Sequence, residues 1–186
     1  PMGISASFRQ LPKPEVERRL QYRFGINSQY ILSVSTMASR KNIVRLIEAF
    51  DCMAGEFPRL RLVVAGSRAE PRSLVHALIH REKIAGRVVF TGPVSDSDLV
   101  ELYNGCALFV FPSLYEGFGL PPLEAMACGA PVVCSNASSL PEVVGDAARL
   151  VVPTDVQALA AAMREVLSDD RLRKDLVEKG LSRVQK

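Results

Sequence analysis

Residues 107–134, ALFVFPSLYEGFGLPPLEAMACGAPVVC, decide the fold. The apolar run Ala107–Phe111 stops at a Pro-Ser turn and predicts a strand. A glycine-rich turn follows it, and Pro121–Cys128 predicts a helix, because proline suits the first helical turn. The apolar run Pro131–Cys134 predicts the next strand. A strand, a helix and a strand in this order predict two parallel strands joined by a helical crossover.

The same alternation extends in both directions from this stretch. Further strands are expected at Tyr30–Ser35, Leu60–Ala65, Val88–Thr91 and Arg149–Val152. Further helices are expected at Asn42–Phe57, Pro71–Ile84, Ser95–Asn104, Ser139–Val144, Val156–Leu167 and Arg171–Arg183. Ser95 is placed to cap its helix. The pattern predicts the α/β class: a Rossmann-like, doubly wound parallel sheet of about six strands flanked by helices.

The first segment fits this alternation poorly. We therefore expect residues 1–27 to form an entry arm that arrives from a preceding domain. Residues 28–186 are expected to form the α/β domain itself.

Composition narrows the class of protein. Hydrophobic residues make up 48% of the chain, which is enough apolar area to favour a folded domain over a disordered one. The net charge of +3, with acidic and basic residues interleaved, does not argue for nucleic acid. No apolar run approaches the roughly 20 residues of a membrane span, and no signal peptide is recognised. The four cysteines lie in apolar contexts without a CxxC pair, so we expect reduced thiols in a cytoplasmic protein.

Residues that core packing does not explain follow the predicted strands. These segments are 35–42, 66–67, 92–93, 112–124 and 135–136. Because the carboxyl ends of parallel strands meet at one edge of a sheet, the segments are expected to gather there. Ligands of such sheets bind at this edge, near the point where strand order reverses.

The chemistry of these segments predicts a ligand with both phosphates and hydroxyls. Arg40 and Lys41 can neutralise a diphosphate. The loop 117–120 lets backbone N–H groups approach an anion at the start of a helix. Glu116 and Glu124 repel phosphate but accept hydrogen bonds from neutral hydroxyls. Taken singly, each of these residues is most simply a surface or turn residue; their shared placement favours a sugar-nucleotide site.

Residues 112–133 also resemble the signature of the retaining glycosyltransferases of family four, often called group one. That signature has two glutamates separated by seven residues, as Glu116 and Glu124 are. The resemblance covers nearly the whole chain. It includes the segments 39–42 (SRKN), 62–66 (LVVAG), 89–92 (VFTG), 139–143 (SLPEV) and 1–4 (PMGI).

The resemblance implies a GT-B fold, with two Rossmann-like domains facing a cleft. This chain is similar to the C-terminal domain, which binds the donor nucleotide sugar. Glu124 is then expected to bind the ribose, Glu116 the transferred sugar, and Arg40 with Lys41 the diphosphate and its departing charge. The remaining donor-binding residues expected by resemblance are Gly117, Phe118, Gly119 and Leu120 near the phosphates, and Gly66, Ser67, Val89 and Phe90 near the base.

The implied activity is that of a hexosyltransferase that retains configuration and needs no metal or other cofactor, since two cations and a helix N-terminus can replace a metal. Glu116 is not expected to be a covalent nucleophile, because retaining glycosidases need two carboxyls about 5–5.5 Å apart around one bond. The acceptor site belongs to the N-terminal domain, so this chain alone is expected to bind nucleotide and to transfer little sugar. Ser35-Thr36 departs from the family, because many members have Gly-Arg there.

By resemblance to family members with an Arg-Lys-Asn turn, GDP-mannose is the expected donor, with UDP-sugars next. The expected acceptor is a saccharide or lipid-linked saccharide in cell-surface polysaccharide biosynthesis. A lipid-linked acceptor would bring the full-length enzyme to the inner face of the cytoplasmic membrane as a peripheral protein.

Three other functions were weighed. A nicotinamide-dependent dehydrogenase requires GxGxxG directly after the first strand, and that motif does not occur there. A glycogen-synthase-like or phosphorylase-like enzyme and a non-catalytic nucleotide-binding or interaction module both stay open. His76 and His80 have a zinc-compatible spacing but lack a further ligand in the sequence, so a surface helix is the simpler interpretation.

Overall fold

The computed structural model describes residues 4–36, 38–66 and 73–185. Within this part of the chain the strands form one six-stranded sheet in the order β3-β2-β1-β4-β5-β6, and every neighbouring pair is parallel. The strands are β1 (Tyr30–Val34), β2 (Arg61–Ala65), β3 (Val88–Gly92), β4 (Leu108–Phe111), β5 (Val132–Ser135) and β6 (Arg149–Val151). Strand order reverses between β1 and β4, which confirms the predicted doubly wound sheet.

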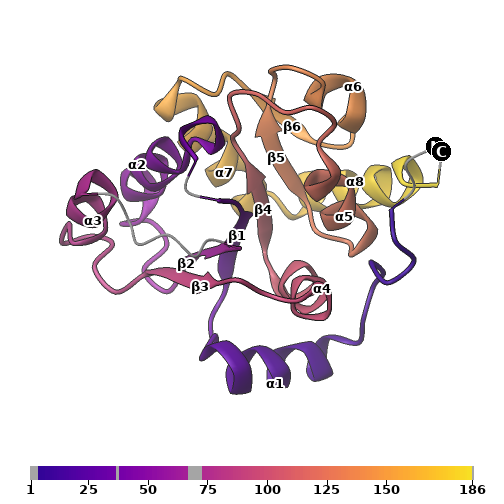
Figure 1. The fold of residues 1–186 in the computed structure, drawn as a ribbon, viewed down its shortest axis with the longest axis horizontal. Helices are drawn as coiled ribbons and strands as arrows, with labels where there is room; N and C mark the ends of the chain where they lie inside the picture. Colours follow the sequence, from indigo (N-terminus) through magenta and orange to yellow (C-terminus); the bar gives the residue numbers. More distant parts are fainter. Residues whose placement is uncertain (1–3, 37, 67–72, 186) are drawn as a thin grey trace.

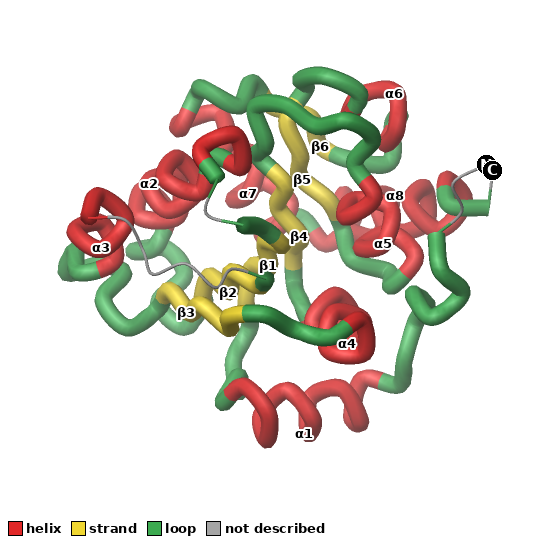
Figure 2. The backbone as a smooth tube through the Cα atoms, viewed as in Figure 1, coloured by secondary structure: helices red, strands yellow, loops and turns green. Residues whose placement is uncertain are grey.

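Helices cover both faces of the sheet, as Figures 1 and 2 show. They are α1 (Lys13–Phe24), α2 (Ile43–Met53), α3 (Ser73–Ile79), α4 (Asp96–Gly105), α5 (Leu120–Ala127), α6 (Leu140–Val144), α7 (Val156–Ser168) and α8 (Asp170–Arg183). A short 3₁₀ helix, η1 (Ser39–Lys41), precedes α2. Ser95 caps α4 as predicted, since its hydroxyl accepts a hydrogen bond from the Asp98 N–H at 3.2 Å.

The core forms two apolar clusters, one on each face of the sheet. Alternate residues of each strand supply them: Ile31 of β1 belongs to one cluster and Leu32 to the other. Helices α2, α3, α7 and α8 complete the first cluster, and α1, α4, α5 and α6 complete the second. Strands buried on both faces explain why the sequence shows continuous apolar runs rather than alternation.

The structure adds one helix that the sequence did not predict. Residues 13–24 form α1, which packs against α4 and buries Val16 and Leu20 in the second cluster (Figure 1). Gly25 ends α1 with a left-handed φ of 63°. The domain boundary expected at residue 27 stays a prediction, but α1 is integral to the core of this domain.

The helix ends differ from expectation by a few residues. The helix expected to begin at Asn42 begins at Ile43, because Asn42 has a left-handed φ of 60° that interrupts the helix after η1. The helix expected at Pro71–Ile84 is observed over Ser73–Ile79, and its first two expected residues lie outside the described part of the chain.

Candidate functional site: the carboxyl edge between β1 and β4

The loops that follow β1 and β4 meet at the point where strand order reverses. The Leu114 N–H donates a hydrogen bond to the Arg40 carbonyl at 2.8 Å. This contact joins η1, which carries Arg40 and Lys41, to the loop that carries Glu116. The predicted gathering of these residues at one edge is therefore present.

Glu116 binds both neighbouring cations directly. Lys41 Nζ lies 2.6 Å from Glu116 Oε1, and Arg40 NH1 lies 3.2 Å from Oε2. The Lys41 side chain is 12% exposed and that of Arg40 is 52% exposed, so Lys41 is the more firmly placed of the two. Lys41 Nζ also lies 4.9 Å from the centre of the Phe111 ring, within reach of a cation–π interaction. This direct pairing was not foreseen from the sequence.

These contacts set the charge of Glu116. Burial alone would raise the pKa of Glu116, but the hydrogen bond from Lys41 and the charges of Lys41 and Arg40 outweigh burial and lower the pKa. Glu116 is therefore a carboxylate in the free protein.

Asn42 fixes the position of the cation turn. Its side-chain amide donates hydrogen bonds to the Pro112 carbonyl at 3.0 Å and the Pro153 carbonyl at 2.7 Å, and Arg45 donates to its Oδ1 at 2.9 Å. Asn42 thereby ties the loop after β1 to the loops after β4 and β6. The sequence alone did not predict this role of Asn42; the available signal was an asparagine directly before a predicted helix.

Two serines after β5 hold the loop 112–119. Ser138 Oγ donates to the Glu116 carbonyl at 2.5 Å, and Ser139 Oγ donates to the Phe118 carbonyl at 3.2 Å. Gly119 has a φ of 93°, and a Cβ there would lie 2.6 Å from Leu140 Cδ2. The glycine is thus required both by backbone conformation and by the approach of α6.

Helix α5 begins at Leu120, directly after this loop. Pro121 and Pro122 carry no N–H, so within its first turn only Leu120 and Leu123 have amide donors. Any anion at this end therefore meets the N–H groups of Gly119 and Leu120 rather than a full ring of helix amides.

Glu124 lies on α5, away from the two cations. Tyr103 of α4 donates its hydroxyl to Glu124 Oε2 at 3.0 Å. Burial raises the pKa of Glu124, the Tyr103 hydrogen bond opposes this, and the charge of Asp96 adds to the rise. The two glutamates of the motif therefore have different surroundings, and their pKa values shift in opposite directions.

The residues expected near a base do not all lie together in the structure. Gly66 ends β2 with a φ of 98°, and its N–H donates to the Gly92 carbonyl at 2.9 Å. Ser67 lies outside the described residues. Val89 and Phe90 lie in the middle of β3, where Val89 packs on one apolar cluster and Phe90 on the other. Their side chains therefore point to opposite faces of the sheet, and the structure does not bring the two together.

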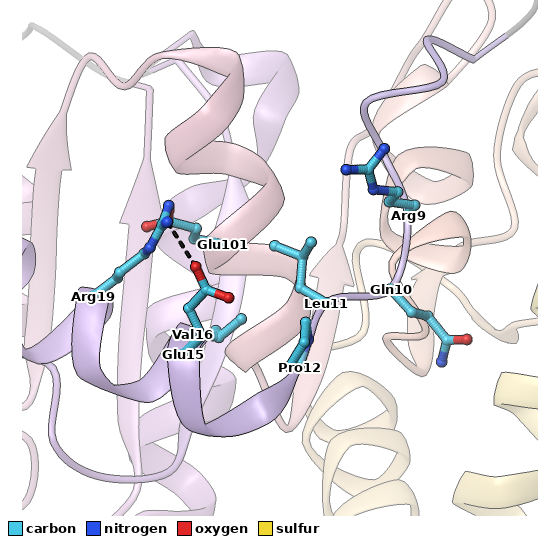
Figure 3. Close-up of a pocket in the computed structure, with 8 residues that line it drawn as sticks. All are labelled: Arg9, Gln10, Leu11, Pro12, Glu15, Val16, Arg19 and Glu101. Carbon is cyan, nitrogen blue, oxygen red and sulfur yellow. Dashed lines mark hydrogen bonds and ion pairs between the residues drawn. The ribbon is translucent and has the colours of Figure 1, made fainter.

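A hollow of about 460 Å³ lies elsewhere, between the segment 9–16 and α4 (Figure 3). Three of its charged side chains pair with one another: Arg19 binds Glu101 and Glu15, each at 2.7 Å. None of the described residues expected at the donor site lines it.

The His76 and His80 rings stack 4.4 Å apart, and His80 Nδ1 lies 2.8 Å from the His76 carbonyl oxygen. In the part of the chain that the structure describes, no group of three or more His, Cys, Asp or Glu side chains is arranged to hold a metal ion. Among the described helices, none has the length and apolar composition needed to cross a membrane.

Comparison with known proteins gives consistent matches. The family model described as glycosyl transferases group 1 matches residues 17–183. The O-antigen chain mannosyltransferase B of Escherichia coli is 44% identical over 158 residues, which are 84% of this chain and 41% of that protein. The chain thus spans about two fifths of that relative.

Two solved structures place the fold. Sucrose-phosphate synthase from Thermosynechococcus elongatus is 30% identical to this chain, with a TM-score of 0.83. The match covers 100% of this chain and 47% of the synthase chain. The C-terminal domain of a glycosyl transferase group 1 family protein from Francisella tularensis is 25% identical with a TM-score of 0.82. The match covers 96% of this chain and 94% of that domain, so the two have the same size.

Proposed function

Because the chain belongs to the group 1 glycosyl transferases, we propose that it binds the nucleotide-sugar donor of a retaining hexosyltransferase. A second, N-terminal domain of the full-length enzyme supplies the acceptor site. The size match to a solved C-terminal domain of the same family supports this division of labour.

One observation carries the proposal. At the point where strand order reverses, Lys41 and Arg40 are bound to a carboxylate that is 10% exposed and ionised. Ligands of doubly wound sheets bind at this point. A diphosphate has the charge and the oxygen atoms to take the place of Glu116 on both cations, and it leaves Glu116 free to accept hydrogen bonds from a sugar.

The roles of the residues follow from their places. Lys41 and Arg40 hold the diphosphate and stabilise its charge as the glycosidic bond breaks, so no metal ion is required. The Gly117–Leu120 loop lines the phosphates through its backbone, and Glu124 accepts hydrogen bonds from the ribose. Gly66, which directly follows β2, faces the base; Val89 and Phe90 cannot both do so, because their side chains lie on opposite faces of the sheet. Glu116 is a hydroxyl acceptor and not a nucleophile, because a retaining glycosidase needs two carboxyls around one bond, whereas the other carboxyl of this motif, Glu124, is bound by Tyr103 and serves the ribose.

The favoured donor is GDP-mannose, and UDP-sugars come next. The mannosyltransferase of Escherichia coli that this chain resembles supports mannose and a role in cell-surface polysaccharide assembly. If the acceptor is lipid-linked, the full-length enzyme acts at the inner face of the cytoplasmic membrane.

The test is a titration of the chain with GDP-mannose and UDP-glucose, repeated on Lys41→Met. A charged hydrogen bond to phosphate is worth about 1.5–3 kcal/mol, so we expect roughly a 10- to 100-fold loss of affinity in Lys41→Met. The control is Lys83→Met, which removes an exposed lysine beyond α3. Equal affinities in the two variants would show that Lys41 does not bind the donor.

A further inference from the structure

Tyr103 is a buried side chain whose polar end reaches the predicted ribose site. It is 0% exposed and belongs to the apolar cluster formed by α1, α4, α5 and α6. Its ring makes edge contacts with Phe109 at 5.2 Å and Phe8 at 6.0 Å between ring centres. These contacts fix the ring, and the hydroxyl donates to Glu124 Oε2 at 3.0 Å.

This hydrogen bond uses only part of the hydrogen-bonding capacity of Glu124. Oε2 accepts from Tyr103, and the carboxylate keeps further lone pairs for other donors. A glutamate without such a partner has three side-chain torsions to order when a ligand binds, and that ordering weakens binding. A hydrogen bond present before binding removes part of that cost.

We propose that Tyr103 is a positioning residue for the ribose: its hydroxyl holds the Glu124 carboxylate in the orientation that accepts the ribose hydroxyls. The inference rests on the proposed function, in which Glu124 binds the ribose. Tyr103 itself does not touch the nucleotide in this arrangement.

The structure provides a matched control in Tyr30 of β1, whose hydroxyl binds the same helix, α4. Tyr30 is also buried, at 1% exposure, and its hydroxyl donates to the Leu102 carbonyl of α4 at 2.7 Å. Tyr30→Phe therefore removes one buried hydroxyl from the same cluster without touching Glu124. Tyr103→Phe removes the hydroxyl that binds Glu124 and keeps the ring.

The experiment compares a ribonucleotide with its deoxy analogues. The chain and both variants are titrated with GDP, UDP and ADP, and then with the 2′-deoxy and 3′-deoxy forms of the tightest binder. Because ordering one side chain costs about 0.5–1.5 kcal/mol, Tyr103→Phe should weaken ribonucleotide binding about three- to tenfold and deoxy-nucleotide binding much less. Tyr30→Phe should bind all of them as the parent chain does.

A pH profile gives a second readout. Besides burial, the groups that shift the pKa of Glu124 are Tyr103, which lowers it, and Asp96, which raises it; Glu124 in turn raises the pKa of Cys128, the residue after α5. Since the Tyr103 hydrogen bond favours the ionised carboxylate, affinity in Tyr103→Phe should decline on acidification at a higher pH than in the parent chain. Tyr30→Phe should show the same pH profile as the parent chain. The phosphates of the nucleotide titrate alike with all three proteins, so a difference between the profiles comes from the protein.

The outcomes separate the inference from the proposed function. A parent chain that binds no nucleotide, or that binds ribo- and deoxynucleotides equally, contradicts the ribose role of Glu124 and the inference with it. A parent chain that prefers ribose, together with a Tyr103→Phe variant that keeps the full preference and the same pH profile, leaves the proposed function standing and overturns the role of Tyr103.

Discussion

At the scale of single residues, the Glu116 carboxylate occupies the two cations, Lys41 and Arg40, in the free protein. Lys41 and Arg40 cannot bind a diphosphate fully while Glu116 holds them at 2.6 and 3.2 Å. Glu116→Gln keeps the shape and removes the charge. We expect it to bind nucleoside diphosphates about three- to tenfold tighter, on the scale of one partly exposed ion pair. A nucleotide sugar should gain less, because a hydroxyl acceptor has been weakened.

Calorimetric titration of GDP or UDP, each with its sugar-linked form, measures this difference. The control is Glu101→Gln, since Glu101 is likewise buried and paired, with Arg19 at 2.7 Å, but lies at the hollow of Figure 3. Weaker diphosphate binding in Glu116→Gln would mean that Glu116 helps to organise the cations instead of competing for them.

Glu124, which we propose binds the ribose, is expected to reduce the stability of the folded protein. Burial raises its pKa in the folded state above the unfolded value, so its ionised form opposes folding at neutral pH. Glu124→Gln should therefore raise the melting temperature at pH 7 while weakening nucleotide binding. The stability gain should shrink below about pH 4, where the parent carboxyl is also protonated.

Thermal unfolding of the two proteins at pH 7 and at acid pH tests this prediction. For Glu116 the effect of ionisation on stability has the opposite sign, because its pKa is lower in the folded state. Its ionised form stabilises the fold at pH values above the unfolded-state pKa, and this contribution is lost as the pH falls through the folded-state pKa. A lower melting temperature for Glu124→Gln at pH 7 would show that its contacts, including that with Tyr103, outweigh its burial.

At the scale of elements, the turn from β4 into α5 depends on one of its two glycines. Gly119→Ala places a Cβ 2.6 Å from Leu140 and forces a residue with a φ of 93°, so it should lower the free energy of unfolding by about 1–3 kcal/mol. The nucleotide affinity should fall with it, because the strained backbone at residue 119 and the displaced Leu140 side chain disturb the loop that lines the phosphates.

Gly117→Ala is the matched control in the same loop. No atom lies within 4 Å of a Cβ placed there, and its φ is outside the left-handed range. Denaturant unfolding of both variants gives the comparison. Equal losses in the two would indicate that loop flexibility matters, rather than the contact with Leu140.

The elements also show what a sequence can predict. All six strands were expected within about a residue of their observed ends, because short apolar, β-branched runs closed by turn residues are distinctive. Helix α1 was missed, because only Val16, Leu20 and Phe24 pack on the core and most of the other residues of the helix are charged or polar. Its signals were weaker: Pro14 near its start and Gly25 after its end.

The sequence predicted where the site lies in the fold, but not which side chains contact one another there. Strand topology brings Lys41 and Glu116 to the same edge, and this much followed from the sequence. Their direct pairing, the hydroxyl of Tyr103 on Glu124, and the Asn42 and Ser138 ties depend on side-chain directions across segments far apart in the chain. Alternation along β3 could have warned that Val89 and Phe90 face opposite sides.

At the scale of the whole molecule, the central claim is that this domain binds a nucleotide diphosphate without a metal, through a motif whose two glutamates have separate roles. One measurement tests it most directly: calorimetric titration of the 186-residue chain with GDP, UDP and ADP, with magnesium and with chelator, repeated for the tightest ligand on Glu124→Ala. The account predicts selective binding of one nucleotide, unchanged by chelator and weakened by the substitution. Binding that requires magnesium, or that Glu124→Ala leaves intact, would contradict it.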